Sequence, residues 1–232
     1  MGNFKKAGVF VVASIVVASL FGGCASSKQA RSVEAKGFLV DYSMLEKGKD
    51  DQALLRYRNP KADIAGYTKV MLDPVLIAKP DKATQEQMAD LQKLATNYYV
   101  YLSTELGKDY SMVQTPGPGT LRIQAAITGA EKSNAVTNTV SSVVPIGMGV
   151  SLVKDFATGK PVGVGEATSE MKITDASTGE LLGAAVDRRV GGKNPDGIID
   201  TWDGADSAME YWAKRLRYVL CLERGGIECV KP

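Results

Sequence analysis

The chain has 232 residues, enough for one domain or two small ones. Its composition, 44% apolar and 23% charged, is that of a globular protein and excludes a fibre or a wholly disordered chain. Lysine and arginine total 28 against 26 acidic residues, so the basic excess that binds nucleic acid is missing. There is no histidine, which removes the commonest general base and a frequent transition-metal ligand.

Residues 1–23 have the pattern of a secretory signal peptide. Lys5 and Lys6 form a short positive segment, and Ala7–Phe21 is an uncharged, mostly apolar stretch. This stretch is shorter than the roughly 20 apolar residues that a membrane-spanning helix requires. We therefore expect residues 1–23 to be removed from the mature protein.

The end of this leader, Leu20-Phe21-Gly22-Gly23-Cys24, resembles the lipobox of bacterial lipoproteins, although Phe21 stands where that motif usually has leucine. The resemblance implies that Cys24 is lipidated and anchors the protein to a membrane. An ordinary cleaved signal with an incidental cysteine is the alternative. Ala25 and Ser26, with no aspartate after Cys24, resemble the sorting signal for the outer membrane, which implies a periplasm-facing protein.

The segment after Cys24 has no structural periodicity. Ala25–Lys36 is small and polar, so we expect residues 24–36 to form the lipidated cysteine and a tether. Gly37–Leu45 is apolar, and we expect it to pack against the surface of the domain.

Several segments favour β-strands because apolar and polar residues alternate in them. They are Thr68–Ile77, Tyr110–Thr115, Thr120–Ile127, Val162–Thr174 and Glu180–Val190. Pro74 indicates an edge or a break in the first strand. The last two segments form a predicted hairpin, in which Glu166 and Glu170 share a face and are expected to be solvated.

Two segments have helical periodicity. Thr84 and Gln87 form a predicted capping box at the start of the first helix, which ends at Gly107. The apolar stripe of that helix consists of Leu91, Ala95, Tyr98, Leu102 and Leu106. The second helix begins near Asp203, and its stripe consists of Ala208, Met209, Trp212, Leu216, Val219 and Leu220.

This order of elements predicts a single α+β domain over residues 37–232. We expect a mostly antiparallel sheet of four to five strands with two helices on one face. An apolar insertion is expected between the central strands.

The insertion, Ser133–Val153, contains no charged residue. Its serines, threonines, glycines and Pro145 argue against a membrane-spanning helix. At a period of two, one face is apolar and consists of Val136, Val140, Val144, Ile146, Met148, Val150 and Leu152. Either this segment folds over the core of its own domain, or it contacts a membrane or a partner subunit.

Two further cysteines lie near the C-terminus. Cys221 and Cys229 flank a Gly225-Gly226 turn, and an oxidising periplasm favours a disulfide between them. Such a bond would hold the last turn of the helix to the C-terminal tail. A redox or metal-binding pair is the alternative, although the spacing is not that of a CxxC motif.

The sequence contains no motif for catalysis. It has no GxSxG elbow, no serine or cysteine that could have a histidine base, and no phosphate or dinucleotide loop. We therefore expect no catalytic residue, no metal and no cofactor, and we expect that the protein is not an enzyme.

Several segments of the mature chain resemble a domain-of-unknown-function (3313) family of Gram-negative lipoproteins. They are Gly37–Leu45, the strand Tyr67–Ile77, Leu121–Ile127 and Asp175–Glu180. This family has no established activity that could be carried over. More loosely, the order of elements with its insertion resembles the periplasmic domains of curli-secretion-type lipoproteins, whose inserted hairpins can build a membrane pore.

The sequence thus favours an outer-membrane lipoprotein that acts as a non-catalytic binding or assembly module. Its expected partners are the membrane, through the N-terminal lipid, and a protein or a second copy of the chain; nucleic acid is not expected. The alternatives are a subunit of a pore or secretion assembly that uses residues 133–153, and a hydrolase.

Overall fold

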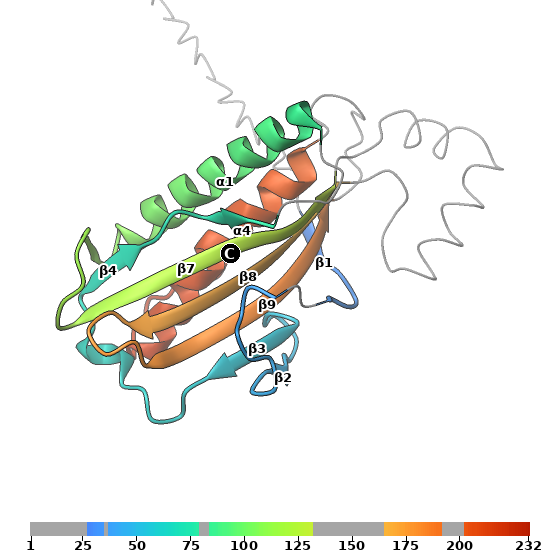
Figure 1. Cartoon of the computed structure of the whole chain (residues 1–232). Coiled ribbons are helices and arrows are strands. Elements are labelled where there is room, and N and C mark those ends of the chain that lie inside the picture. The colour runs from blue at the N-terminus through green and yellow to red at the C-terminus, as the bar shows by residue number, and fades with distance from the viewer. Residues whose placement is uncertain (1–26, 35–36, 79–83, 132–164, 192–201) are drawn as a thin grey trace, which may run out of the picture.

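The computed structural model describes residues 27–34, 37–78, 84–131, 165–191 and 202–232 (Figure 1). These ranges form one sheet of nine strands with two long helices, so the α+β class is confirmed. The helices are α1 (Gln85–Leu106) and α4 (Asp203–Glu223), and η1 (Ile64–Gly66) is a single 3-10 turn. The strands are β1 (Ser27–Gln29), β2 (Glu46–Lys47), β3 (Leu55–Arg58), β4 (Lys69–Leu72), β5 (Leu76–Ile77), β6 (Ser111–Met112), β7 (Thr120–Glu131), β8 (Glu166–Asp175) and β9 (Leu181–Gly191).

The sheet is larger than the expected four to five strands, and it is mixed. Its order is β2-β3-β9-β8-β7-β4-β6, with β1 beside β9 and β5 beside β7. Strands β7, β8 and β9 are antiparallel, but β4 runs parallel to β6 and β7, and β5 runs parallel to β7. The parallel pairs arise because α1 crosses between β5 and β6 and so returns the chain in the same direction. The strands that the sequence did not predict, β1, β2 and β3, have two to four residues and carry too little alternation to be recognised.

Both helices cover one face of the sheet, behind the strands in Figure 1. The predicted capping box of Thr84 and Gln87 is present at the start of α1. Every residue of the predicted stripe of α1 is buried, and so are Leu121, Ile123, Ala125 and Ile127 of β7. Asp206 of α4 joins the two helices, because it accepts hydrogen bonds from Asn97 (2.8 Å) and Tyr101 (2.6 Å).

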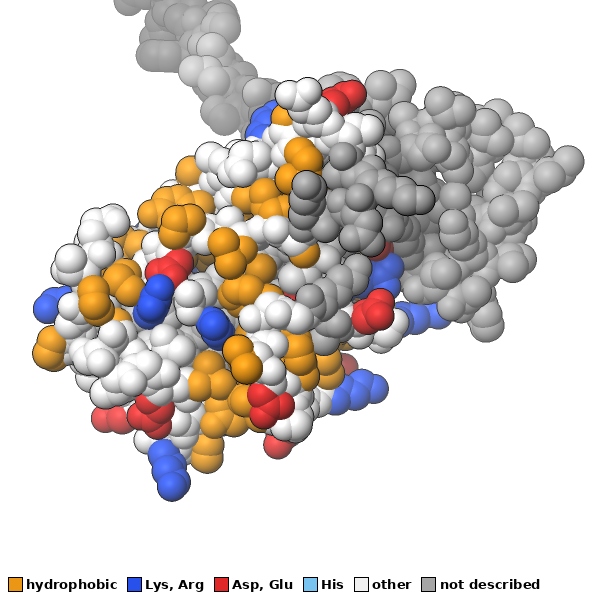
Figure 2. All heavy atoms as spheres, viewed as in Figure 1, with side chains coloured by type: hydrophobic (Ala, Val, Ile, Leu, Met, Phe, Trp, Pro, Cys, Tyr) orange, Lys and Arg blue, Asp and Glu red, His pale blue; other side chains and the backbone are white. Residues whose placement is uncertain are grey.

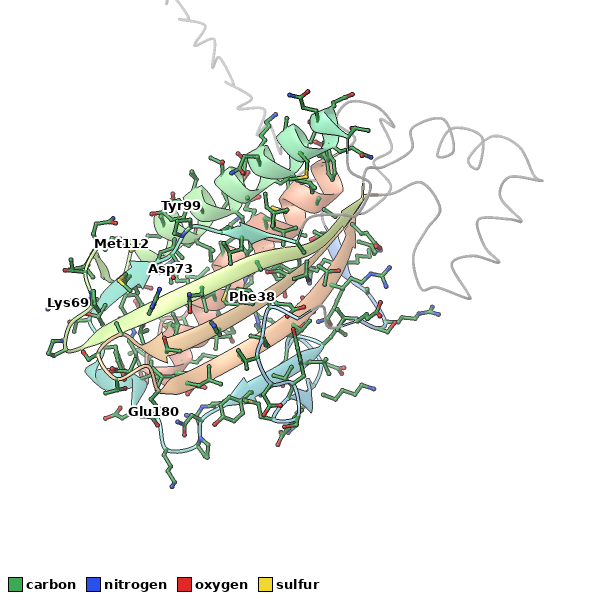
Figure 3. All side chains as sticks on the ribbon, viewed as in Figure 1. Phe38, Lys69, Asp73, Tyr99, Met112 and Glu180 are labelled. Carbon is green, nitrogen blue, oxygen red and sulfur yellow. A yellow bond between two sulfur atoms is a disulfide. The ribbon has the colours of Figure 1, made fainter. Side chains whose placement is uncertain are left out.

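The opposite face of the sheet is partly covered by residues 37–45, as expected for this apolar segment. Leu39 is buried there with Ala184 and Val186 of β9. Phe38 lies in front of the sheet in Figure 3, and the ammonium group of Lys172 is 5.3 Å from the centre of its ring. On the face turned to the viewer in Figure 2, acidic and basic side chains are interspersed with apolar ones.

A polar hub holds this segment to the sheet. The hydroxyl of Tyr42 donates to Glu170 and accepts from the backbone N–H groups of Gly37 (2.7 Å) and Leu39 (3.0 Å). Glu170 is completely buried and Glu166 is 9% exposed, so the expectation that both carboxylates are solvated is wrong. The reason is that the N-terminal segment covers Glu170 and Arg188 pairs with Glu166 (2.7 Å).

Part of the range 24–36, which the sequence predicts as a tether, is paired with the sheet. Ser27–Gln29 form β1 and pair with residues 189–191 of β9. Ala30 is also buried, and its N–H donates to the carbonyl of Arg188 (2.8 Å). The polar composition of this segment hides the pairing because a short edge strand needs only backbone hydrogen bonds.

Candidate functional site

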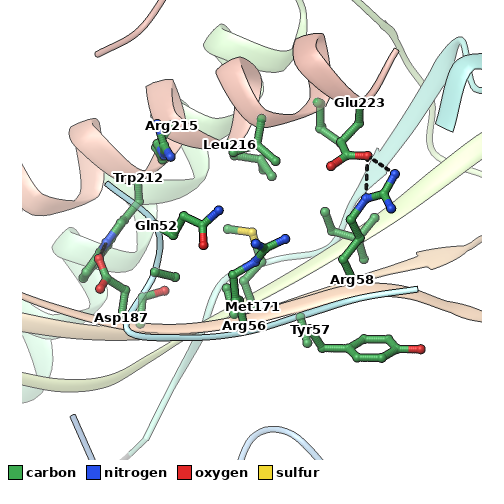
Figure 4. Close-up of a pocket in the computed structure, with 18 of the residues that line it drawn as sticks. Gln52, Arg56, Tyr57, Arg58, Met171, Asp187, Trp212, Arg215, Leu216 and Glu223 are labelled. Atoms are coloured by element: carbon green, nitrogen blue, oxygen red, sulfur yellow. Dashed lines mark hydrogen bonds and ion pairs between the residues drawn. The ribbon is translucent and has the colours of Figure 1, made fainter. Parts of the chain in front are cut away.

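The main candidate site is a pocket of about 270 Å³ between α4 and the sheet. Its walls come from α4 on one side and from β3, β9 and β8 on the other (Figure 4). This volume lies just below the usual range for ligand sites, about 300–1,000 Å³.

The pocket exists because β9 presents small residues to α4. Gly183 and Ala185 point to the helix-covered face, since they are paired with Ile173 and Met171 of β8, which face the core. Because a glycine and an alanine occupy neighbouring positions on this face of β9, space is left beneath the helix that larger residues would fill. The sequence contains this signal, but it cannot be interpreted until the register of β9 is known.

The lining is mainly apolar. Met171 and Ile173 form the floor, and Leu216 and Leu220 of α4 lie opposite. Tyr98 of α1 lies at the deep end, where its hydroxyl is 3.2 Å from the hydroxyl of Ser169. Complete burial raises the pKa of Tyr98 well above its usual value, so this phenol stays neutral. The deep part of the pocket therefore suits an apolar group.

One end of the pocket is closed by Trp212 and Asp187. The indole N–H of Trp212 donates to Asp187 Oδ2 (2.8 Å). The other carboxylate oxygen, Oδ1, accepts from the side chain of Gln29 (2.7 Å) and from the backbone N–H of Leu54 (3.2 Å). The tryptophan ring also packs on Tyr98, with 5.9 Å between ring centres. Asp187 is therefore fully engaged in positioning α4, β1 and the segment before β3.

The other end is bridged by an ion pair between the sheet and the helix. Arg58 Nε of β3 donates to Glu223 Oε2 of α4 (2.7 Å), and this contact raises the pKa of Arg58 (Figure 4). Arg56, two residues earlier on β3, points to the same face and lines the pocket. Arg215 of α4 lines it as well, so three guanidinium groups surround an apolar interior.

The site residues predicted from the sequence are not among the described residues that line the pocket. Cys24 and the apolar residues of the insertion (Val136, Val140, Val144, Ile146, Met148, Val150 and Leu152) fall outside the described residues. The expected disulfide between Cys221 and Cys229 is present, with 5.7 Å between the two Cα atoms, and it connects the last turn of α4 to the C-terminal tail. Sequence reasoning missed the pocket, because its lining comes from segments far apart in the chain.

The described residues contain neither a membrane-spanning helix nor a cluster of metal ligands. Neither α1 nor α4, nor any other helix in the described ranges, has the length and apolar character to cross a bilayer. Within the same ranges, no three histidine, cysteine or acidic side chains come together as a possible metal site.

The fold is that of an α+β domain, with a mixed sheet, two helices on one face and a pocket beneath the second helix. The chain belongs to the family described as "Protein of unknown function (DUF3313)", which matches residues 34–216. Among curated proteins it is similar to the uncharacterized lipoprotein YdcL of Escherichia coli (strain K12), with 26% identity over 182 residues and 77% of each chain covered.

Two solved structures show a weak likeness. One is the PelC dodecamer from Paraburkholderia phytofirmans, with 7% identity, coverage of 75% of this chain and 96% of that one, and a TM-score of 0.39. The other is a putative lipoprotein from Caulobacter crescentus CB15, with 11% identity, coverage of 71% and 95%, and a TM-score of 0.34. Scores this low carry no argument about function, and nothing in these comparisons supports a pore or secretion subunit.

Proposed function

We propose that the protein is a non-catalytic binding module of the cell envelope, anchored by lipid at Cys24 to the outer membrane and facing the periplasm. Its curated relatives are lipoproteins, and Leu20–Cys24 resembles a lipobox, both of which support the anchor. The observation that carries the proposal is the position of β1. Ser27, three residues after Cys24, is already paired with Gly191 of the sheet.

Two buried side chains hold β1 in place. The guanidinium of Arg189 donates to the backbone carbonyl (2.6 Å) and to the hydroxyl (3.0 Å) of Ser27, and it stacks 3.5 Å from the ring centre of Tyr211. Burial lowers the pKa of Arg189, and the neighbouring Tyr211 acts in the opposite direction. Gln29 is held by Asp187, as described above. A lipid on Cys24 would therefore lie within about 10 Å of the sheet.

Other parts of the chain converge on the same end of the molecule. Strand β7 ends at Glu131, which is paired with Glu166 at the start of β8. Glu166 is also paired with Val190 of β9, and the next residue of β9, Gly191, is the partner of Ser27. The first turn of α4 also lies here, because Gly204 approaches Gly191 so closely that a Cβ at Gly191 would be 2.7 Å from the Cα of Gly204. The residues that flank 132–164 thus lie at the end of the domain that an acylated Cys24 would bring to the bilayer.

The test combines mass spectrometry with a measurement of orientation. We expect the native polypeptide to begin at Cys24 with acyl groups attached and to fractionate with the outer membrane, whereas Cys24→Ala leaves the membrane. Fluorophores at Lys28→Cys and Ser177→Cys, both exposed positions, report on opposite ends of the sheet. Quencher lipids should quench the label at position 28 and not the one at 177. An unmodified thiol at Cys24 would overturn the anchor, and equal quenching would overturn the orientation.

A further inference from the structure

We propose that the pocket beneath α4 binds an anionic amphiphile, a single apolar chain with a carboxylate or phosphate head that Arg56 and Arg215 hold. This inference gives the proposed binding module a ligand class. It rests on that binding role but not on the acylation of Cys24.

The charge balance of the pocket favours an anion. Each acidic side chain among the described lining residues already has a partner: Asp187 with Trp212 and Gln29, Glu223 with Arg58, and Asp51 with Lys231. The hydrogen bond and ion pair of the exposed Asp51 are to Lys231, which lowers the pKa of this carboxyl, and Arg215 also contributes to that shift. No described carboxylate of the lining forms a hydrogen bond with Arg56 or Arg215. An anionic ligand would supply the missing acceptor.

The two arginines themselves have donors to offer. No hydrogen bond of the Arg56 guanidinium to another described residue is present, although the side chain is half-buried. Arg215 Nη1 is buried and has no hydrogen-bond acceptor in the described part of the chain. Its guanidinium carbon lies 5.0 Å from the ring centre of Tyr218, a contact that positions the group without satisfying its N–H donors. A buried guanidinium N–H without an acceptor is costly, and a carboxylate or phosphate is the acceptor that suits it.

The apolar lining and the volume of the pocket indicate what the part of the ligand beyond its anionic head should be. Met171, Ile173, Leu216 and Leu220 offer only apolar contacts, so the group between the arginines and Tyr98 should be apolar as well. A volume of about 270 Å³ suits one chain and excludes a lipid with several. A fatty acid and a single-chain phosphate share this chemistry, and separate titrations can distinguish them.

The experiment uses the mature chain with Cys24→Ser, which cannot be acylated. All the contacts described above lie within residues 27–232, so the fold does not require the lipid, and thermal unfolding verifies that each variant is folded. Calorimetric titrations use decanoate, decyl phosphate, decanol and decyltrimethylammonium below their micelle concentrations. We expect saturable binding of one or both anions, binding of decanol at least tenfold weaker, and none of the cation.

Three kinds of variant locate the site. Arg56→Gln and Arg215→Gln should each weaken binding of the anion about tenfold, because each removes a charge-assisted hydrogen bond. Lys93→Gln removes one charge from an exposed position on α1 and should leave binding unchanged. Ala185→Leu should abolish binding because it fills the cavity.

Several results would overturn the inference. They are absence of saturable binding to the folded chain, equal affinity for decanol and decanoate, an equal loss in Lys93→Gln, or retention of binding in Ala185→Leu. None of them bears on whether Cys24 is acylated, so failure here and failure of the proposed anchor are separately recognisable.

Discussion

Ala184 and Ala185 are neighbours on β9, but they point to opposite faces of the sheet and have different surroundings. Ala184 is buried in the small cluster formed with Leu39 and Val186 under residues 37–45. Ala185 lines the pocket beneath α4 and is only half-buried. The same small side chain therefore permits close packing on one face and leaves a cavity on the other.

The two faces also differ in how their covers are attached. A long apolar interface holds α1 and α4 to one face, so that a gap at its edge can be tolerated. The opposite cover is a short segment whose attachment depends on the polar hub of Tyr42 and Glu170. This contrast suggests that the helix-covered face can accommodate a ligand, whereas the other face is a packed support.

The largest expected effect comes from enlarging each alanine in turn. Ala184→Leu should lower the free energy of unfolding by about 1–3 kcal/mol, because Ala184 is buried against Leu39 and Val186 and a larger side chain would have to displace them. Ala185→Leu should raise it by about 0.5–2 kcal/mol, because leucine fills an existing cavity. Denaturant titration of both variants measures the difference. Equal destabilisation by the two substitutions would contradict the contrast between the faces.

The sequence predicts the helix-covered face well because its signals are local. The capping box at Thr84 and the alternation in β7 are complete within single elements, and both are confirmed. Strands β1 and β2 could not be predicted, since β1 is short and polar and pairs with a distant segment of β9, and β2 has only two residues.

The pocket and the hub lay beyond sequence reasoning for a related reason. Arg56, Gly183 and Leu216 come together only after β3, β9 and α4 have taken their places. Glu170 has the pattern of a solvated residue on its strand, and its donors Tyr42 and Leu39 come from a distant segment of the chain. The acylation of Cys24 and the role of residues 133–153 stay predictions.

A smaller effect on stability should follow from removing the hydroxyl group of Tyr42 at the centre of the polar hub. Tyr42→Phe removes the hydroxyl that donates to Glu170 and accepts from Gly37 and Leu39, so we expect a loss of about 1 kcal/mol in the free energy of unfolding. Hydrogen exchange should increase in residues 37–45 and not in α1 or α4. Tyr57→Phe is the matched control, because this tyrosine belongs to the same cluster but its hydroxyl forms no hydrogen bond with the described residues. Faster exchange throughout the sheet would argue against a local hub.

The smallest effect concerns a polar contact on the helix-covered face. Arg217 of α4 donates to Asp109, just after α1, at 2.8 Å, and this hydrogen bond lowers the pKa of Asp109, although partial burial opposes the shift. A carboxyl whose pKa is depressed in the folded state stabilises the protein above its unfolded pKa of about 3.9, and this contribution is lost as the pH falls through the folded pKa.

Asp109→Asn should therefore cost less than about 1 kcal/mol near pH 7, as is usual for a partly exposed ion pair, and the difference from the unsubstituted chain should shrink as the pH falls below about 4. Urea titrations between pH 7 and pH 2.5 measure this. Arg217→Gln removes the other partner and should produce the same convergence at acid pH. A difference that stays constant over this range would mean that Asp109 acts through packing rather than through its charge, and the helix-covered face would then have no acid-sensitive contact between its helices at this position.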